Sequence, residues 1–439
     1  MHRLVVLFVA SLATLHPVHS IPTSSSAAVE PVLDRRRQDT SFTARDAPGL
    51  PSNGLSSSGI RLGVLPDWNQ ESPQEINRAL GDSISVIGDY LNVSPDDYAF
   101  RQVDYHLDSV VRAATGNVKA VYAPAVLFGA SLDQWTLEMT TNLAQAMKKV
   151  TDKGVPVWLR WCFEMNGGWM PYGLQPDRYV PLFRDVANAV RAVSNETYML
   201  FAPNIWNGPV DDASQGYMPY FPGEEYVDLV GLSFYSLGED KSKNQAPSST
   251  LFRSGFTPFY NLFSPASASA SSNRLSLSRP YPVVIAETSA PFYYTIPPGS
   301  KYFLQAGDTN VQVPLPNLTT YSPSLASPPN PRSTDELYLK ASWLVQLTSN
   351  STAARFPNLR AVSWFNHLKR AVEPVLADFR FVGGNSTVEA WLRQNFGNQT
   401  AYEQGYTGGA TRSGRGGRSP LEWSLIVAVV GSISFVSLA

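Results

Sequence analysis

The stretch VPVWLRWCFEMNGGWMPYG, residues 155–173, decides how the rest of the chain is interpreted. It begins as an apolar strand pattern and ends in a polar, aromatic segment, with Glu164 at the change. Alternate side chains of a strand share a face, so Arg160, Cys162 and Glu164 are predicted to point the same way. A carboxylate at the end of a buried strand is costly unless it is paired. Glu164 is therefore either the partner of Arg160 in a salt bridge or one half of a catalytic pair.

Seven further runs resemble this strand, and most are nearly continuous in apolar and β-branched residues, as strands buried on both faces are. The eight runs lie at 60–65, 85–91, 119–126, 155–162, 198–202, 228–234, 283–286 and 359–364. Helical patterns lie between them at 73–80, 97–114, 132–152, 177–193 and 334–347, the third with Ser131 and Gln134 at capping-box spacing. This alternation predicts an α/β fold, the (β/α)8 TIM barrel. A doubly wound open sheet is the alternative, but no strand is followed by a glycine-rich phosphate loop.

The composition argues against several kinds of partner. The 439 residues carry a formal net charge of -2, which gives no basic field for a nucleic acid. A single cysteine excludes an intramolecular disulfide, and with only 5 histidines it argues against a zinc or copper site. We expect a monomer without a cofactor. Aromatic residues make up 12% of the chain, which suits both sugar stacking and a large core.

The N-terminal residues predict a leader. Residues 1–20 have the pattern of a signal peptide, with an apolar run at 4–12 that is too short to span a membrane. Residues 21–58 are Ser- and Pro-rich without periodicity and predict a disordered linker or pro-segment. Within it, residues 35–37 (RRR) are either a processing site or a solvated charge cluster. The ordered domain is predicted to span 59–404.

The C-terminus has the pattern of a GPI-anchor signal, with a small-residue site and polar spacer in 405–420 and a removable apolar tail in 421–439. A single-pass tail anchor is the alternative, but nothing charged follows the tail. Six N-glycosylation sequons agree with a secreted glycoprotein; they lie at Asn92, Asn195, Asn317, Asn350, Asn385 and Asn398. We expect a secreted protein at the cell surface, held to the plasma membrane or cell wall only by its lipid anchor.

A second carboxylate ends the seventh strand pattern, in RPYPVVIAETSAPFYY, residues 279–294. Val283, Ile285 and Glu287 are predicted to share a face that points Glu287 at the barrel axis. Glu164 and Glu287 then face each other across the mouth of the barrel. This layout is typical of retaining glycoside hydrolysis, in which one carboxyl group protonates the leaving oxygen and the other attacks the anomeric carbon. Two unrelated buried ion pairs are the alternative.

The segment LRWCFEMNGGWMPYG at 159–173 resembles the acid/base segment of glycoside hydrolase family 26, a clan A family of β-mannanases and relatives. IAETSA at 285–290 resembles its nucleophile strand, VGLSFY at 230–235 its sixth strand, and SWFNHLK at 363–369 with the later DFR its eighth. Over about residues 60–396 the resemblance implies Glu164 as acid/base and Glu287 as nucleophile, in a fungal-type GPI-anchored member. The family has a sugar-binding His where this chain has Phe163, which leaves β-mannan, β-1,3- or β-1,4-glucan and xylan open as substrates.

Other residues near the strand ends are candidate substrate contacts. For Arg160, a charge partner of a carboxylate is favoured over a substrate contact, and Tyr235 either donates to Glu287 or caps the core. By the resemblance, Trp364 forms the floor below the reactive sugar. Loop candidates, each with loop packing as the alternative, are Asn166, Trp169, Tyr172, Asn204 and Trp206, with Asp67 and Trp68 at a distant subsite. Cys162 is expected to be a small core residue facing inward, and His367 a polar loop residue.

The sequence thus predicts a retaining β-glycosidase that hydrolyses or remodels a cell-wall polysaccharide, with mannan as the default substrate. Glu164 is expected to have a raised pKa so that it can act as an acid. A non-catalytic surface lectin on a degenerate barrel is the alternative, with Phe163 as the mark of lost catalysis. A purely structural surface protein would explain neither inward-facing carboxylate.

Overall fold

The computed structural model describes residues 46–396, apart from 116–118, 209–212, 241–242, 266–276, 299–317, 319–320, 326–334 and 371–374. Within this part of the chain, eight parallel strands close into a barrel, because β2 (Ile60–Pro66) pairs with both β3 (Val86–Val93) and β11 (Leu359–Asn366). The other five are β4 (Val121–Phe128), β5 (Val157–Trp161), β6 (Thr197–Phe201), β7 (Leu229–Ser233) and β8 (Val283–Thr288). The predicted (β/α)8 barrel is confirmed, and each strand overlaps one of the eight predicted runs.

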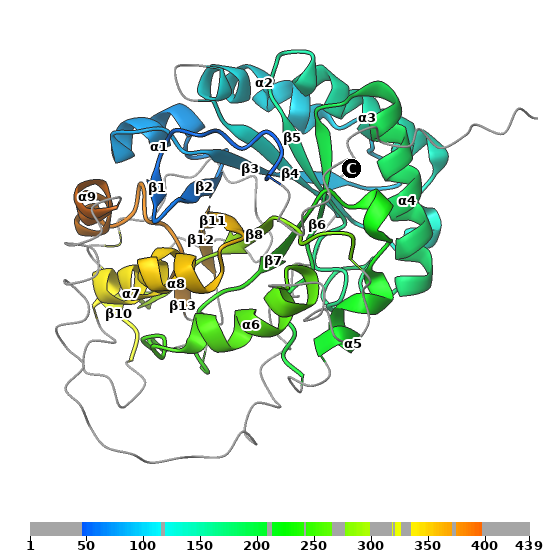
Figure 1. Cartoon of the computed structure of the whole chain (residues 1–439). Coiled ribbons are helices and arrows are strands. Elements are labelled where there is room, and N and C mark those ends of the chain that lie inside the picture. Colours follow the sequence, from blue (N-terminus) through cyan, green and yellow to red (C-terminus); the bar gives the residue numbers. More distant parts are fainter. Residues whose placement is uncertain are drawn as a thin grey trace, which may run out of the picture. The chain divides into compact units, whose positions relative to one another are not determined.

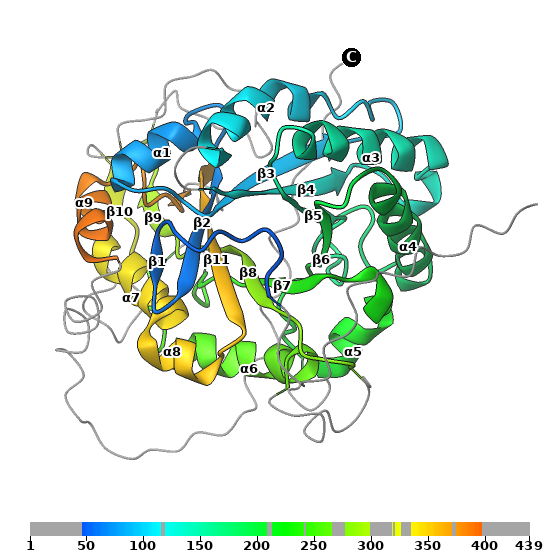
Figure 2. The same ribbon diagram turned by 45° about the horizontal axis from the view of Figure 1, so that its top comes forward.

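Helices lie around the strands (Figures 1 and 2). They are α1 (Pro73–Leu80), α2 (Arg101–Ala114), α3 (Leu137–Thr151), α4 (Pro176–Val193), α5 (Ala213–Tyr217), α6 (Leu251–Phe263), α7 (Glu336–Thr348), α8 (Asn350–Arg355) and α9 (Ser386–Asn395), with 3-10 turns η1 (Leu132–Gln134), η3 (Met218–Tyr220) and η4 (Glu224–Tyr226). All five predicted helices are present, whereas α5, α6, α8 and α9 were not predicted. In the described residues, none of these helices combines the length and apolarity that crossing a membrane requires.

The predicted start of the third helix is wrong. Ser131 precedes only the turn η1, and its hydroxyl donates to Gln175 Oε1 at 2.8 Å instead of capping a helix. Trp135 is extended, with φ −75° and ψ 121°, so the helical pattern is interrupted there. Helix α3 begins after Thr136, whose hydroxyl accepts from the Met139 N–H at 3.2 Å. The capping-box spacing at Ser131 therefore marked a neighbouring turn.

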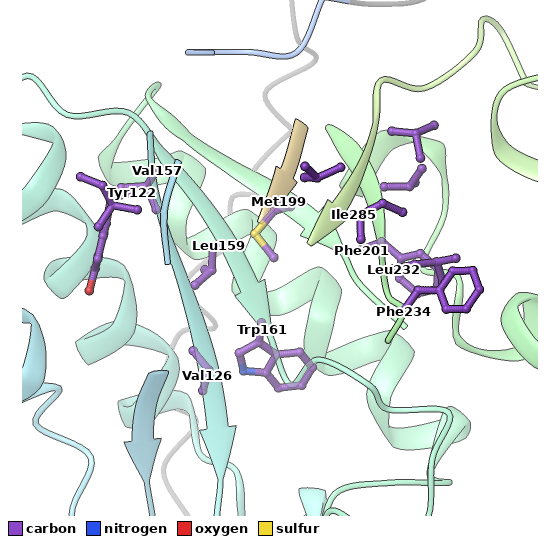
Figure 3. Close-up of a cluster of buried hydrophobic side chains, with 14 of the residues drawn as sticks. Tyr122, Val126, Val157, Leu159, Trp161, Met199, Phe201, Leu232, Phe234 and Ile285 are labelled. Carbon is purple, nitrogen blue, oxygen red and sulfur yellow. The ribbon is translucent and has the colours of Figure 1, made fainter. Parts of the chain in front are cut away.

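Two apolar clusters separate the inside of the barrel from the layer between strands and helices. The inner cluster consists of strand side chains, many of them small, such as Ala123, Ala125 and Ala361 around Trp158. The outer cluster joins the opposite faces of the strands to the helices, and Figure 3 shows ten of its members as labelled sticks. Because both faces of these strands are buried, their sequences are continuous apolar runs.

Residues 46–58, which were predicted to be part of a disordered segment, are ordered against the barrel. The Trp158 indole donates to the carbonyl oxygen of Pro48 at 2.7 Å, and Ala47 and Leu50 pack against the inner cluster. The short strand β1 (Ser56–Ser57) pairs antiparallel with β2. The ordered chain therefore begins before residue 59. The predicted signal peptide, most of the linker and the predicted anchor signal lie outside the described residues.

A second, small sheet follows the carboxyl ends of β8 and β11. Its strands, in spatial order, are β10 (Ser322–Pro323), β9 (Phe292–Thr295), β13 (Val375–Asp378) and β12 (Leu368–Arg370), all antiparallel. A buried polar network supports it, in which Lys340 donates to Glu336 Oε1 at 2.5 Å and Arg380 binds both oxygens of Asp378 at 2.9 and 2.8 Å. The network ties α7 to the segment after β13.

Four of the six predicted sequons lie in the described residues. Asn92, Asn195 and Asn350 are exposed. Asn385 is half-buried, and its amide nitrogen donates to Glu336 Oε2 at 3.0 Å. The sequons at Asn317 and Asn398 lie outside the described residues.

Candidate active site

Glu287 points into the mouth of the barrel because β8 has a bulge directly before it. Ile285 belongs to the outer cluster and Ala286 to the inner one, so strict alternation would turn Glu287 toward the helices. The sequence argument that Ile285 and Glu287 share a face is therefore wrong. In the pairing with β7, Leu232 lies opposite Ile285 and Ser233 opposite Glu287, so Ala286 is an extra residue. This extra residue reverses the phase of the strand and brings Glu287 inward.

Glu164 lies in a tight turn directly after β5. Cys162 and Glu164 have φ values of 45° and 55°, which are uncommon for residues other than glycine. The turn moves Cys162 into the outer cluster and Phe163 into the inner one, so the predicted inward direction of Cys162 is wrong, although it is fully buried. The Glu164 N–H donates to the carbonyl oxygen of Ala202 at 2.8 Å, which ties the turn to the end of β6. Backbone strain of this kind is typical of functional sites.

The carboxylate of Glu287 is held at both oxygens. Arg160 Nη2 donates to Oε2 at 3.0 Å, and the Tyr235 hydroxyl donates to Oε1 at 2.5 Å. The side chains of Arg160 and Glu287 are only 1% and 8% exposed, so water is largely excluded from the ion pair. Burial and the charge of Glu287 raise the pKa of Tyr235 well above its usual value, which keeps the hydroxyl protonated as a donor. Arg160 is thus the charge partner of Glu287, and Tyr235 is its second donor.

Among the residues that the structure describes, none forms an ion pair of this kind with Glu164. The indole of Trp169 donates to its Oε2 at 2.7 Å, and the side chains of Ser233 and Asn204 lie beside it. Burial raises the pKa of Glu164, and the nearby negative charge of Glu287 raises it further, while the three polar neighbours oppose this shift. A carboxyl group with a raised pKa keeps its proton to a higher pH than an ordinary carboxyl group does, as a general acid must.

Aromatic rings surround the two carboxyl groups. Tyr90, within β3, has its ring 5.9 Å from that of Phe163 and 6.2 Å from that of Phe365, measured between centroids. Phe365 also lies edge-on to Tyr235 at 6.0 Å, and the guanidinium carbon of Arg160 lies 4.7 Å from the Phe163 centroid. We call Tyr90, Phe163, Tyr235 and Phe365 the mouth cluster. Tyr90 was not predicted as a site residue, although a tyrosine near the end of an apolar run indicates such a position.

Several predicted loop residues gather beside Glu164. Asn166 donates to the carbonyl oxygen of Asn204 at 2.9 Å and accepts from its N–H at 2.8 Å, which joins the segments after β5 and β6. Trp169 contacts Glu164 directly, as described above. Tyr172 is fully buried and donates to the carbonyl oxygen of Phe163 at 2.8 Å, so it is a packing residue.

Trp206, on the segment after β6, is a packing residue at least in part. Its backbone N–H donates to the Tyr217 hydroxyl at 2.8 Å. Its ring lies so close to Gly208 and Gly216 that a Cβ atom at either glycine would be 2.2 or 2.4 Å from a ring carbon. Both glycines are therefore required for this position of the ring.

Trp364 does not lie at the mouth. Its side chain is 1% exposed in the outer cluster, its indole donates to the carbonyl oxygen of Phe379 at 2.7 Å, and its ring packs 5.0 Å from Phe381. The predicted sugar floor is therefore wrong. The next residue along β11, Phe365, points inward instead, because neighbouring residues of a strand face opposite sides.

The two candidates after β2 also lie apart from the mouth cluster. Trp68 stacks on His106 with ring centroids 4.1 Å apart. Asp67 lines a cavity of about 310 Å³ together with Glu71, Asn366 and Arg380. Neither Glu164 nor Glu287 lines this cavity.

Two carboxyl groups thus lie at the carboxyl ends of the barrel strands, where active sites of such barrels lie. One has a raised pKa and the other is held by an arginine and a tyrosine, an arrangement that is compatible with glycoside hydrolysis. Among the described residues, no group of three His, Cys, Asp or Glu side chains is arranged to hold a metal ion.

Comparison with known proteins finds a family match in the segment that carries both carboxyl groups. Residues 130–294, the segment that carries Glu164 and Glu287, match the model of glycosyl hydrolase family 26. The chain is 25% identical over 211 residues to "Endoglucanase H" of Acetivibrio thermocellus, and this match covers 44% of the chain and 21% of the relative. It is 29% identical over 115 residues to "Mannan endo-1,4-beta-mannosidase" of Bacillus subtilis, which covers 24% of this chain and 32% of the relative. The chain thus spans less than a third of either relative.

Among solved structures, the catalytic domain of an endo-beta-1,4-mannanase of family 26 from Bacillus sp. JAMB-750 matches with 16% identity and a TM-score of 0.47. The match covers 84% of this chain and 95% of that chain.

Proposed function

We propose that this chain is a retaining β-glycosidase that acts on a polysaccharide of the β-mannan type, with Glu164 as acid/base and Glu287 as nucleophile. One observation carries the proposal, namely the difference between the two carboxyl groups. Burial and a neighbouring negative charge raise the pKa of Glu164, whereas Arg160 and Tyr235 donate to both oxygens of Glu287. The first environment suits a proton donor and the second an oriented anionic nucleophile.

In the first step, Glu287 attacks the anomeric carbon while Glu164 gives its proton to the glycosidic oxygen. The bond to the leaving sugar breaks, and an ester forms between the glycan and Glu287. In the second step, Glu164 takes a proton from a water molecule, whose oxygen attacks the anomeric carbon and releases Glu287. Arg160 and Tyr235 fix the orientation of Glu287 throughout, so that little reorganisation is needed during reaction.

The choice of β-mannan is supported by the family and by the name of the Bacillus subtilis relative. The name of the Acetivibrio thermocellus relative supports β-glucan as the second candidate. Phe163 cannot form a hydrogen bond at the position where the resemblance implies a histidine, so the contacts to the reactive sugar differ in this chain.

We also propose that the enzyme is secreted and held at the cell surface by a GPI anchor, where it remodels cell-wall glycan. This rests on the sequence patterns at the two ends. Release of the protein from cells by a phosphatidylinositol-specific phospholipase would support the anchor, and retention after that treatment would contradict it. Transfer products at high acceptor concentration would support remodelling, and hydrolysis alone would count against it.

The test of the activity is release of reducing sugar from mannan, mixed-linkage glucan, β-1,3-glucan and xylan. We expect one polymer to be cleaved by the wild type, and Glu164→Gln and Glu287→Gln to lose about a thousandfold or more in kcat/KM. Glu225→Gln, at an exposed position, serves as the matched control and should retain activity. Turnover unaffected by either substitution would contradict the assignment. Binding without turnover in all four proteins would instead indicate a carbohydrate-binding protein.

A further inference from the structure

We propose that His367 binds the substrate by accepting a hydrogen bond from a hydroxyl group of the glycan. This inference rests on the proposed function and deepens it. His367 was predicted from the sequence to be a polar loop residue.

His367 belongs to the mouth of the barrel. It directly follows β11, and its ring stacks on Phe365 with centroids 4.1 Å apart and an angle of 11°. It also lies edge-on to Tyr90 at 6.1 Å. Tyr235 contacts Phe365 and donates to Glu287. His367 is thus separated from the surroundings of Glu287 by a single layer of rings.

One nitrogen of this ring is an acceptor without a partner. Nε2 is buried and has no hydrogen-bond partner in the described part of the chain. The backbone of Pro66 lies within hydrogen-bonding reach of the ring, so we assign this bond to Nδ1. Proline has no N–H, so this bond goes to the carbonyl oxygen and uses the ring's N–H. Burial, reinforced by the positive charge of Lys369, lowers the pKa of His367 to about 3. The ring is therefore neutral at working pH, and Nε2 carries a lone pair.

An unpaired acceptor in a buried position destabilises the protein unless something donates to it. Its ring neighbours Phe365 and Tyr90 lie around it as aromatic surfaces, which suit the apolar face of a sugar. A glycan bound across the mouth cluster would bring hydroxyl groups to this position. His106 differs from His367 in that its Nδ1 has a polar partner, since it lies 2.7 Å from Asp89 Oδ2, and its ring stacks on Trp68.

The test compares three substitutions of His367 on the polymer that the wild type cleaves. His367→Phe keeps a ring on Phe365 but removes both nitrogens, and His367→Asn keeps a donor for Pro66 but removes the acceptor at Nε2. Both should lower kcat/KM about tenfold or more, with an unchanged thermal midpoint for His367→Asn. His367→Gln places an amide oxygen near the position of Nε2 and should recover part of the loss. His106→Phe is the matched control and should leave kcat/KM within about twofold.

The outcomes separate this inference from the proposed function. A wild type that cleaves a polymer, with His367→Phe and His367→Asn within about twofold of it, overturns the role of His367 alone. Equal losses in all three variants with a lowered thermal midpoint indicate a purely structural role and also overturn it. A wild type that neither cleaves nor binds any of the polymers overturns both proposals.

Discussion

Replacing Arg160 by methionine is expected to lower the free energy of unfolding by about 3–5 kcal/mol, because the carboxylate of Glu287 would remain buried without its ion-pair partner. Arg160 Nη2 and Glu287 Oε2 are 3.0 Å apart, in side chains that are 1% and 8% exposed. At an effective dielectric constant of about 20, Coulomb attraction at this distance is about 5.5 kcal/mol. Nε and Nη1 of Arg160 lack partners among the described residues, and their removal offsets part of the loss.

The loss can be measured as a change in the thermal midpoint. With about 2.1 cal/mol/K of unfolding entropy per residue and roughly 300 ordered residues, 3–5 kcal/mol corresponds to about 5–8 °C. The double variant Arg160→Met/Glu287→Leu removes both charges and should unfold at a higher temperature than Arg160→Met alone. Arg191→Met is the control, because Arg191 pairs with Asp228 at 3.1 Å but is 34% exposed, and it should cost about 1 kcal/mol or less. Equal midpoints for the two single variants, or no recovery in the double variant, would refute the reasoning.

Three further predictions concern single side chains. Tyr235→Phe removes one of the two donors to Glu287 and should lower kcat about ten- to a hundredfold with little change in KM. Steady-state kinetics can check this, and a change in KM alone would contradict it. Trp169→Phe removes a hydrogen bond that lowers the pKa of Glu164, so this pKa should rise. The alkaline limb of the pH profile of kcat/KM should then move to higher pH, and a shift to lower pH would argue against Glu164 as the acid. Burial raises the pKa of Glu71 from 4.5 to about 8. Between these two pH values the native protein keeps the proton of Glu71 while the unfolded chain releases it, so the native state loses stability as the pH rises from about 4.5 to 8. Glu71→Gln should therefore unfold at a higher temperature than the wild type at pH 9 but not at pH 4, which calorimetry at both pH values can test.

The barrel could be predicted from the sequence because its strands are buried on both faces and are separated by helical patterns. The runs at 155–162 and 283–286, which correspond to β5 and β8, stand out even without knowledge of their neighbours. The small sheet could not be predicted in this way. Its strands pair across long distances in the chain, such as Phe292 with Asp378, and each is too short to give a pattern of its own. Helix α6 was missed because Pro258 lies inside it, next to a Ser-rich segment.

Glu164 and Glu287 lie close enough for their charges to interact, but alternation alone did not explain how they meet. The bulge at Ala286 reverses the phase of β8 and is visible only in its pairing with β7. The positive φ of Cys162 likewise exchanges the directions expected for Cys162 and Phe163. At the eighth strand, the same uncertainty of phase led to Trp364 in place of Phe365. Residue types near a strand end thus indicated which strands carry the candidate site, but not which side chain of each strand points inward.

The central claim is that Glu287 forms a covalent bond to the sugar while Glu164 supplies and recovers the proton. The most direct measurement is trapping with a 2-deoxy-2-fluoro glycoside that carries an activated leaving group, made from the sugar of the polymer that the wild type cleaves. We expect one equivalent of ester per protein, located by peptide mass spectrometry on Glu287 and absent in Glu287→Gln. An ester on another residue, or turnover with inversion at the anomeric carbon and no adduct, would contradict the account.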